Sequence, residues 1–283
     1  MVEKEIVARR LKFGLPKDLP RFWNDNCPTK TYLFNAIAIL APGFERLAIS
    51  SVVPFKDDIP DPTLKAQIKG FIGQESAHGS EFIRYNQILK TQGYDVKRLE
   101  KWNIKSFRKI AKKLSPKMHL SLSLAGEHLT AIISDLVLRD KRWLEHAHSA
   151  NAAIWRWHSI EEIEHKAVVF DLYLSIGGGY FARILGMWLI TWVLGRLLIR
   201  NFFHMARHDK QLFKFSFWKK TLILLWAKKG FMRQLMLPYL KYYSPRFHPW
   251  QQNNLELITK WKKIFYQAQS NDDMVQQLQQ DYV

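Results

Sequence analysis

The stretch WHSIEEIEH, residues 157–165, most constrains what this chain can fold into, because it places two histidines and three glutamates within nine positions. In a helix, at about 100° per residue, His158, Glu162 and His165 share one face, whereas Glu164 points to the far side. Apolar neighbours indicate that this face is buried, and buried imidazole and carboxylate groups together suit iron, zinc or manganese. A solvated helix with hydrogen-bonded Glu and His side chains is the alternative that this stretch alone leaves open.

A second helical pattern, QESAHG, repeats the same spacing between a glutamate and a histidine. Glu75 and His78 are three residues apart, as are Glu162 and His165. Bundles that bind two metal ions through carboxylates take one such motif from each of two helices and a lone glutamate from each of the other two. The sequence therefore predicts two more inward glutamates, one before Glu75 and one between the two pairs.

Two glutamates on apolar stripes occupy these places, Glu45 in PGFERLAIS and Glu127 in LSLAGEHLTA. The 30 residues from Glu45 to Glu75 and the 35 from Glu127 to Glu162 suit two helical hairpins. The 52 residues from Glu75 to Glu127 leave room for the single long crossover of ferritin-like bundles. The ordered pattern predicts a site for two metal ions. Its candidate ligands are Glu45, Glu75, His78, Glu127, His158, Glu162 and His165.

Glu161 competes with Glu162 for a place among these ligands. It lies about 40° from His165 on a helical wheel. The spacing of Glu162 to His165 matches that of Glu75 to His78, so Glu161 is assigned to a place behind the ligands or to the surface.

The ligand order resembles that of the ferritin-like di-iron oxygenases, and the extra His158 resembles the added histidine of the three-histidine arylamine N-oxygenases. Over most of the chain, a set of motifs looks more closely like the bacterial proteins described as predicted metal-dependent hydrolases. These motifs are FGLPKDLPRFW, QESAHG, GEHLTA, WHSIEEIEHKAV and SPRFHPW. The resemblance implies two iron ions, with a manganese/iron pair or zinc as alternatives.

Strand-like alternation is nearly absent, so we expect an all-α chain with a ferritin-like four-helix bundle, a long crossover and a C-terminal helical extension. The expected parts are a basic lead-in (1–30), the di-metal bundle (31–178) and a basic, Trp-rich extension (179–283). The bundle helices are expected at about 31–52, 62–92, 116–140 and 143–176, and the basic crossover is expected to be helical as well. Pro42-Gly43 predicts that the first helix kinks or restarts just before Glu45.

The charge and the single cysteine indicate compartment and partners. Cys27 alone excludes an intrachain disulfide framework and a cysteine zinc site, and it fits a reducing compartment. MVEKEIVARR lacks the apolar core of a signal peptide, so we expect a cytoplasmic protein. The net charge of +18 suggests nucleic acid as a partner. The basic residues interleave with Leu, Ile and Trp, however, and this pattern disfavours nucleic-acid binding.

The C-terminal third concentrates the charge and the tryptophans. Residues 180–283 hold 16 Lys and Arg against 5 Asp and Glu, together with six of the eleven tryptophans. Its charge-free run from Ile184 to Gly195 is about 12 residues, shorter than the roughly 20 that a bilayer span needs. Residues 180–245 are therefore predicted to hold the protein on an anionic membrane, at its inner face. Burial against the bundle or in a homodimer, and a true span, are the alternatives.

Three classes of function remain open on these observations. The first is a di-iron enzyme that activates dioxygen and oxidises an apolar or acyl substrate, with an electron donor as a further partner. The second is a metal-dependent hydrolase that uses a hydroxide bridging two metals. The third is a non-catalytic metal-binding or membrane-associated protein.

Overall fold

The computed structural model describes residues 6–280, and these form α-helices and short 3-10 turns joined by loops. Within that range the structure has no β-strand, and its β-type pairing is an isolated bridge between Asn24 and Ala147. The predicted all-α bundle fold is confirmed.

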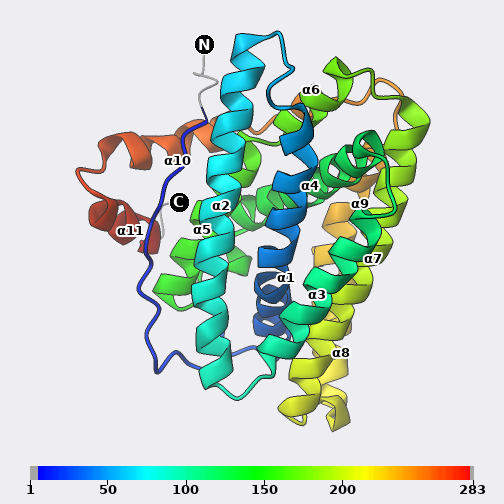
Figure 1. Ribbon diagram of the computed structural model, residues 1–283. Coiled ribbons are helices and arrows are strands. Elements are labelled where there is room, and N and C mark those ends of the chain that lie inside the picture. Colours follow the sequence, from blue (N-terminus) through cyan, green and yellow to red (C-terminus); the bar gives the residue numbers. More distant parts are fainter. Residues whose placement is uncertain (1–5, 281–283) are drawn as a thin grey trace.

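Two helical hairpins build the bundle. In Figure 1, α1 and α2 run side by side, and α3 crosses diagonally beside α1 in the long connection to the second hairpin. The bundle helices and the crossover helix are α1 (Pro28–Val52), α2 (Pro62–Thr91), α3 (Val96–Ala111), α4 (Pro116–Arg139), α5 (Ser149–Glu164) and α6 (Val168–Ser175). The first, second and third bundle helices begin and end within a few residues of the expected positions.

Local sequence explains where these helices begin. Asp61 accepts a hydrogen bond from the backbone N–H of Thr63, and Ser115 accepts one from that of Met118. In both helices a proline occupies the first turn, where its missing N–H costs no helical hydrogen bond. These caps fix the starts of α2 and α4, which each carry candidate ligands.

Close approach of α1 and α4 depends on Gly126. A Cβ atom at this position would lie 2.4 Å from Cε2 of Phe44, which is closer than packed atoms come. The absent side chain therefore lets α4 lie against α1, and it does so one residue away from both Glu45 and Glu127.

Two expectations about the helices need correction. α1 runs without interruption through Pro42, so of the kink or restart expected before Glu45 the restart does not occur, although proline removes one backbone hydrogen bond there. The helix expected over 143–176 begins only at Ser149 and is divided by a break at 165–167. His165 lies in this break, as the residue that ends α5, with φ −99° and ψ 6°.

In the C-terminal part, the residues that the structure describes add five α-helices on two sides of the bundle. They are α7 (Tyr180–His208), α8 (Phe215–Trp226), α9 (Phe231–Lys241), α10 (Leu255–Gln267) and α11 (Asn271–Gln279). α7 packs on α4 and α1, whereas α10 and α11 pack on α5 at the opposite side of the molecule (Figure 1). Trp218 contacts Phe203, and the hydroxyls of Thr191 and Tyr239 lie 3.2 Å apart, so α8 and α9 return along α7.

Three helical segments in the described residues are long and apolar enough to cross a membrane, by length and composition. They are Pro28–Phe55, Pro116–Arg139 and Tyr180–His208, with mean hydropathies of 1.5, 1.2 and 1.6. The first two are mainly buried inside the fold, while only 39% of the most apolar window of Tyr180–His208 is buried. The short run identified in the sequence is thus part of a 29-residue helix that is long and apolar enough, by length and composition, to cross a membrane.

Candidate metal centre

The structure brings all seven candidate ligands into one buried cluster. Glu45 comes from α1, Glu75 and His78 from α2, Glu127 from α4, and His158, Glu162 and His165 from α5 and its end. Each of the seven is at most 6% exposed. Because burial of several ionisable groups is costly unless they are paired or bind a cation, the cluster needs a physical explanation.

One group of donors surrounds the Nε2 atom of His165. This atom lies 3.1 Å from Glu127 Oε2, 3.2 Å from Glu75 Oε1 and 3.4 Å from Glu162 Oε2. Glu75, Glu127 and His165 offer ligand atoms that all lie within 4.8 Å of one another. The two Glu-x-x-His pairs are therefore in direct contact.

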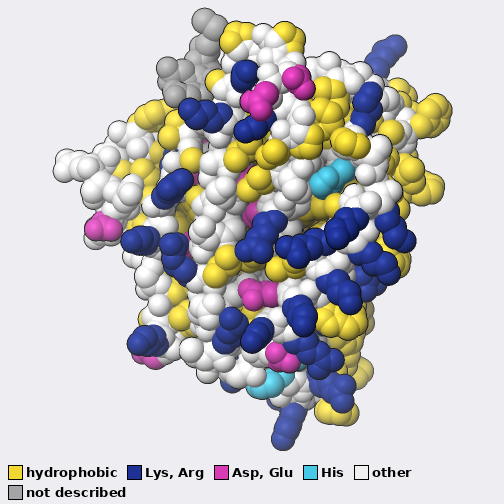
Figure 2. Space-filling model, in the orientation of Figure 1, with side chains coloured by type: hydrophobic (Ala, Val, Ile, Leu, Met, Phe, Trp, Pro, Cys, Tyr) yellow, Lys and Arg dark blue, Asp and Glu magenta, His cyan; other side chains and the backbone are white. Residues whose placement is uncertain are grey.

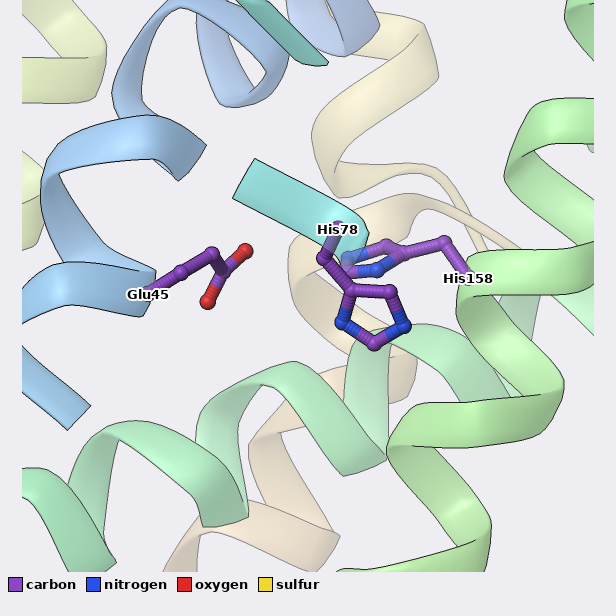
Figure 3. A group of neighbouring side chains, drawn as sticks. All are labelled: Glu45, His78 and His158. Atoms are coloured by element: carbon purple, nitrogen blue, oxygen red, sulfur yellow. The ribbon is translucent and has the colours of Figure 1, made fainter. Parts of the chain in front are cut away.

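A second group of donors lies around His78. Glu45, His78 and His158 offer atoms within 4.8 Å of one another, and Figure 3 shows the Glu45 carboxylate pointing from α1 towards the two imidazoles. His78 Nδ1 lies 3.3 Å from Glu162 Oε1 and 3.6 Å from Glu75 Oε1. Glu75 and Glu162 thus contact a histidine of each group, and with His78 they form a third, overlapping group of donor atoms that lie within 4.8 Å of one another.

The donor atoms of this cluster fit a metal because hydrogen bonds leave them free. Every candidate ligand has at least one buried nitrogen or oxygen without a hydrogen-bond partner. These atoms include both carboxylate oxygens of Glu75 and of Glu127, Nδ1 of His78 and Nε2 of His165. Buried polar atoms are rarely left unpaired in proteins, so cations at the cluster would satisfy groups that the protein itself does not.

Protonation equilibria at the cluster reflect this crowding. Burial raises the pKa of Glu127 to about 8, and the neighbouring Glu75 carboxylate adds to the rise. Burial likewise raises the pKa of Glu45 well above its ordinary value. Burial lowers the pKa of His158 to about 4, which keeps its imidazole neutral near pH 7. A neutral imidazole is the form that binds metal.

His165 is oriented by Gln74, which sequence reasoning missed. The Nδ1–H of His165 donates to Gln74 Oε1 at 2.9 Å, which leaves Nε2 towards Glu75 and Glu127. Gln74 in turn donates to Glu164 at 2.9 Å. Partners of this kind fix the tautomer and the ring orientation of histidines that bind metals.

His78 is oriented from its other side by Glu161. The Nε2–H of His78 donates to Glu161 Oε2 at 2.9 Å, and Arg9 donates to Glu161 Oε1 at 2.9 Å. Both Glu161 oxygens are therefore occupied, and the side chain is fully buried. Of the two places predicted for Glu161, the position at the surface is wrong, because the Glu161 side chain is buried directly behind His78.

Glu164 points away from the candidate ligands, as the helical wheel predicts, but it is not solvated. Arg9 binds it through both terminal nitrogens, at 2.8 and 3.1 Å, and Lys262 from α10 lies 3.3 Å away. Against the raising effect of burial, Arg9 holds the pKa of Glu164 below its ordinary value. No spacing pattern in the sequence links Arg9 or Lys262 to this site.

A small pocket reaches the cluster at His158. Its lining comes from α1, α4, α5 and α9 and is mainly apolar. The lining includes Leu33, Ile37, Ile133, Val137, Trp155, His158 and Phe231. Phe82 also packs edge-on against the His158 ring, with 4.9 Å between the ring centres. The side of the cluster at His158 is therefore bordered by apolar surface.

Comparison with known protein families shows what this chain is similar to. A family model described as predicted metal-dependent hydrolase matches residues 7–253, a range that includes Arg9 and all seven candidate ligands. No curated protein and no solved structure matches this chain. These comparisons therefore do not support the resemblance of its motif to the N-oxygenases.

Proposed function

The chain belongs to the family of predicted metal-dependent hydrolases, and from this premise and the cluster's geometry we propose an enzyme that binds two iron ions and oxidises an apolar substrate with dioxygen. One observation carries the proposal: Glu75 and Glu162 lie between two sets of buried donors, one with Glu127 and His165, the other with Glu45, His78 and His158. Four carboxylates and three imidazoles suit iron and balance its charge.

The bound iron pair would supply the electrons and the open coordination positions that dioxygen reduction needs. The protein's own groups prepare this centre. Gln74 and Glu161 hold His165 and His78 with one nitrogen each towards the carboxylates. At neutral pH and without a cation, the Glu127 carboxyl retains a proton, which it gives up when a cation binds.

The substrate class follows from the surroundings of His158. The adjoining pocket is lined largely by aliphatic and aromatic side chains, which favours an apolar molecule or an acyl chain over a polar one. The low exposure of the cluster also limits the access of bulk water. Both features suit oxidation better than hydrolysis.

Hydrolysis is the second candidate, and the family description favours it. Two metals held by carboxylates and histidines can lower the pKa of a water and orient it towards an ester or amide bond. In that reading Thr130, Ser134 and Ser159, which also line the pocket, provide the polar contacts for such a substrate.

The decisive experiment loads the protein with ferrous iron under anaerobic conditions and then admits air. Oxygen uptake in proportion to bound iron, with a transient visible absorption band, is expected for the oxidase. Hydrolysis of ester or amide substrates by the zinc- or manganese-loaded protein, without oxygen uptake by the iron form, would instead establish a hydrolase. If neither activity appears although two metal ions bind, a non-catalytic metal-binding role replaces the proposal.

A further inference from the structure

A stripe of large apolar side chains lies exposed along α7. Its members are separated by three, four or seven residues, so they share one helical face. They are Phe181, Leu185, Trp188, Trp192, Ile199 and Phe203, and Trp188 and Trp192 are 64% and 65% exposed. Contiguous exposed apolar surface of this kind marks an interaction site.

The returning helices α8 and α9 expose more apolar side chains. On α8 these are Phe215, Leu222, Ile223 and Trp226, and on α9 they are Met232, Met236, Leu237 and Leu240. Basic residues accompany them, with exposed Lys219, Lys220, Lys228, Lys229 and Arg233 in the same segment. The segment from Gln211 to Lys241, all of which the structure describes, includes no acidic side chain.

A strongly basic helix borders the α7 stripe. α3 carries six Lys and Arg residues against one glutamate. Arg196 of α7 lies over the Trp192 ring at 5.3 Å and donates to Ser106 of α3, and Arg200 lies over the α3 residue Trp102 at 3.9 Å. Figure 2 shows the result, with Lys and Arg gathered over α3 beside hydrophobic side chains along the edge formed by α7.

We propose that this surface docks the protein peripherally on an anionic lipid bilayer. The docking surface consists of the α7 stripe, the exposed apolar residues of α8 and α9, and the basic face of α3. Charge complementarity favours an anionic bilayer as the partner of this surface. The aromatic and aliphatic side chains enter the interfacial region of the bilayer, while the lysines and arginines of α3 contact acidic headgroups. A second copy of this chain would bring the same basic border against itself, at an electrostatic cost.

The test is flotation of the full chain with vesicles of phosphatidylethanolamine and phosphatidylglycerol, compared with vesicles of phosphatidylcholine. At low salt the protein is expected to float with the anionic vesicles and far less with the neutral ones. High salt should release part of it, because headgroup attraction is screened whereas apolar burial is not, and detergent should release all of it.

Two variants separate the two components of the docking surface. Trp188→Ser/Trp192→Ser removes apolar contact, and Lys101→Glu/Lys105→Glu reverses the charge of the α3 border. Each basic residue near an anionic surface contributes about fivefold in binding, so the lysine variant should lose roughly 30-fold or more. The matched controls lie on α10, at the other side of the molecule: Tyr266→Ser, and Lys260→Glu/Lys263→Glu, which remove exposed side chains of the same types.

Three results would overturn the proposal. In the first, the protein stays at the bottom of the gradient with anionic vesicles at low salt. In the second, light scattering without lipid finds a stable dimer that the Trp188→Ser/Trp192→Ser variant loses, which makes this face a dimer contact. In the third, the protein resists extraction by alkaline carbonate and also enters neutral vesicles, which makes α7 a span.

Discussion

Arg9 contacts none of the seven candidate ligands, but it binds the carboxylates that help to orient two of them. Its guanidinium binds Glu161, which accepts from His78, and Glu164, which accepts from the Gln74 that orients His165. One cation thus supports the orientation of both histidines that belong to the Glu-x-x-His pairs.

Arg9→Gln is expected to lower iron affinity about 10- to 100-fold, the usual effect of losing a group that orients metal ligands. The measurement is a titration with ferrous iron against a competing chelator. Arg10→Gln is the control, because Arg10 is exposed at the neighbouring position. Equal affinities for the two variants would show that Arg9 has no part in ordering the site.

Glu161 and Glu162 provide a second comparison, between adjacent residues with different roles. Glu162→Ala is expected to abolish binding of two metal ions, because its oxygens face both donor groups at 3.3 and 3.4 Å. Glu161→Ala should leave two ions bound but more weakly, since Glu161 reaches the site only through His78. Metal analysis after gel filtration distinguishes them, and the reverse result would exchange the two assignments.

Sequence spacing could predict which residues gather here, because helical periodicity relates Glu75 to His78 and Glu162 to His165. It could not predict Arg9, whose partners Glu161 and Glu164 lie 152 and 155 residues away along the chain. A contact of that range depends on how the whole fold closes.

At the scale of helices, the bundle was predictable from apolar periodicity, whereas the caps Asp61 and Ser115 were identified only in the structure. The break at 165–167 was not, because WHSIEEIEHKAV contains no proline or glycine to signal it. The exposed half of α7 was suggested by composition, but only the packing of α4 and α1 decides which of its faces remains uncovered.

Asp209, just beyond the end of α7, connects several elements through its carboxylate. Tyr32 and Tyr94 donate to one oxygen at 2.6 and 2.5 Å, and Arg21 and His208 contact the other. Against the raising effect of burial, these groups hold the pKa of Asp209 below its ordinary value. The charged form therefore stabilises the fold above pH 3.8, and this contribution is lost as the pH falls through the lowered pKa.

Asp209→Asn is accordingly expected to reduce the free energy of unfolding by about 1–3 kcal/mol near pH 7, as for loss of hydrogen bonds to a charged group. The difference from the parent should shrink as the pH falls below about 4. Urea unfolding at several pH values measures it. Asp58→Asn, at an exposed loop position, is the control, and a pH-independent difference for Asp209→Asn would contradict the role assigned to its charge.

For the molecule as a whole, the unpartnered donors at the centre predict that metal binding and folding are coupled. Ferrous iron at about 100 times its dissociation constant should raise the melting temperature by roughly 5–10 °C over protein kept in chelator. Calorimetry or circular dichroism under anaerobic conditions measures the shift. The Glu162→Ala variant should show no such rise, and an unchanged melting temperature in the parent would mean that the folded state does not bind the ion.

The contacts of Glu164 with Arg9 and with Lys262 have a consequence for biosynthesis. Every candidate ligand has been translated once the ribosome passes residue 165, but Lys262, which lies against Glu164, is made almost a hundred codons later. During that interval α10 cannot yet cover this side of the nascent bundle. We therefore expect a cation to reach the candidate ligands more readily before α10 is made than after it, so the order of synthesis along the chain bears on when the site fills.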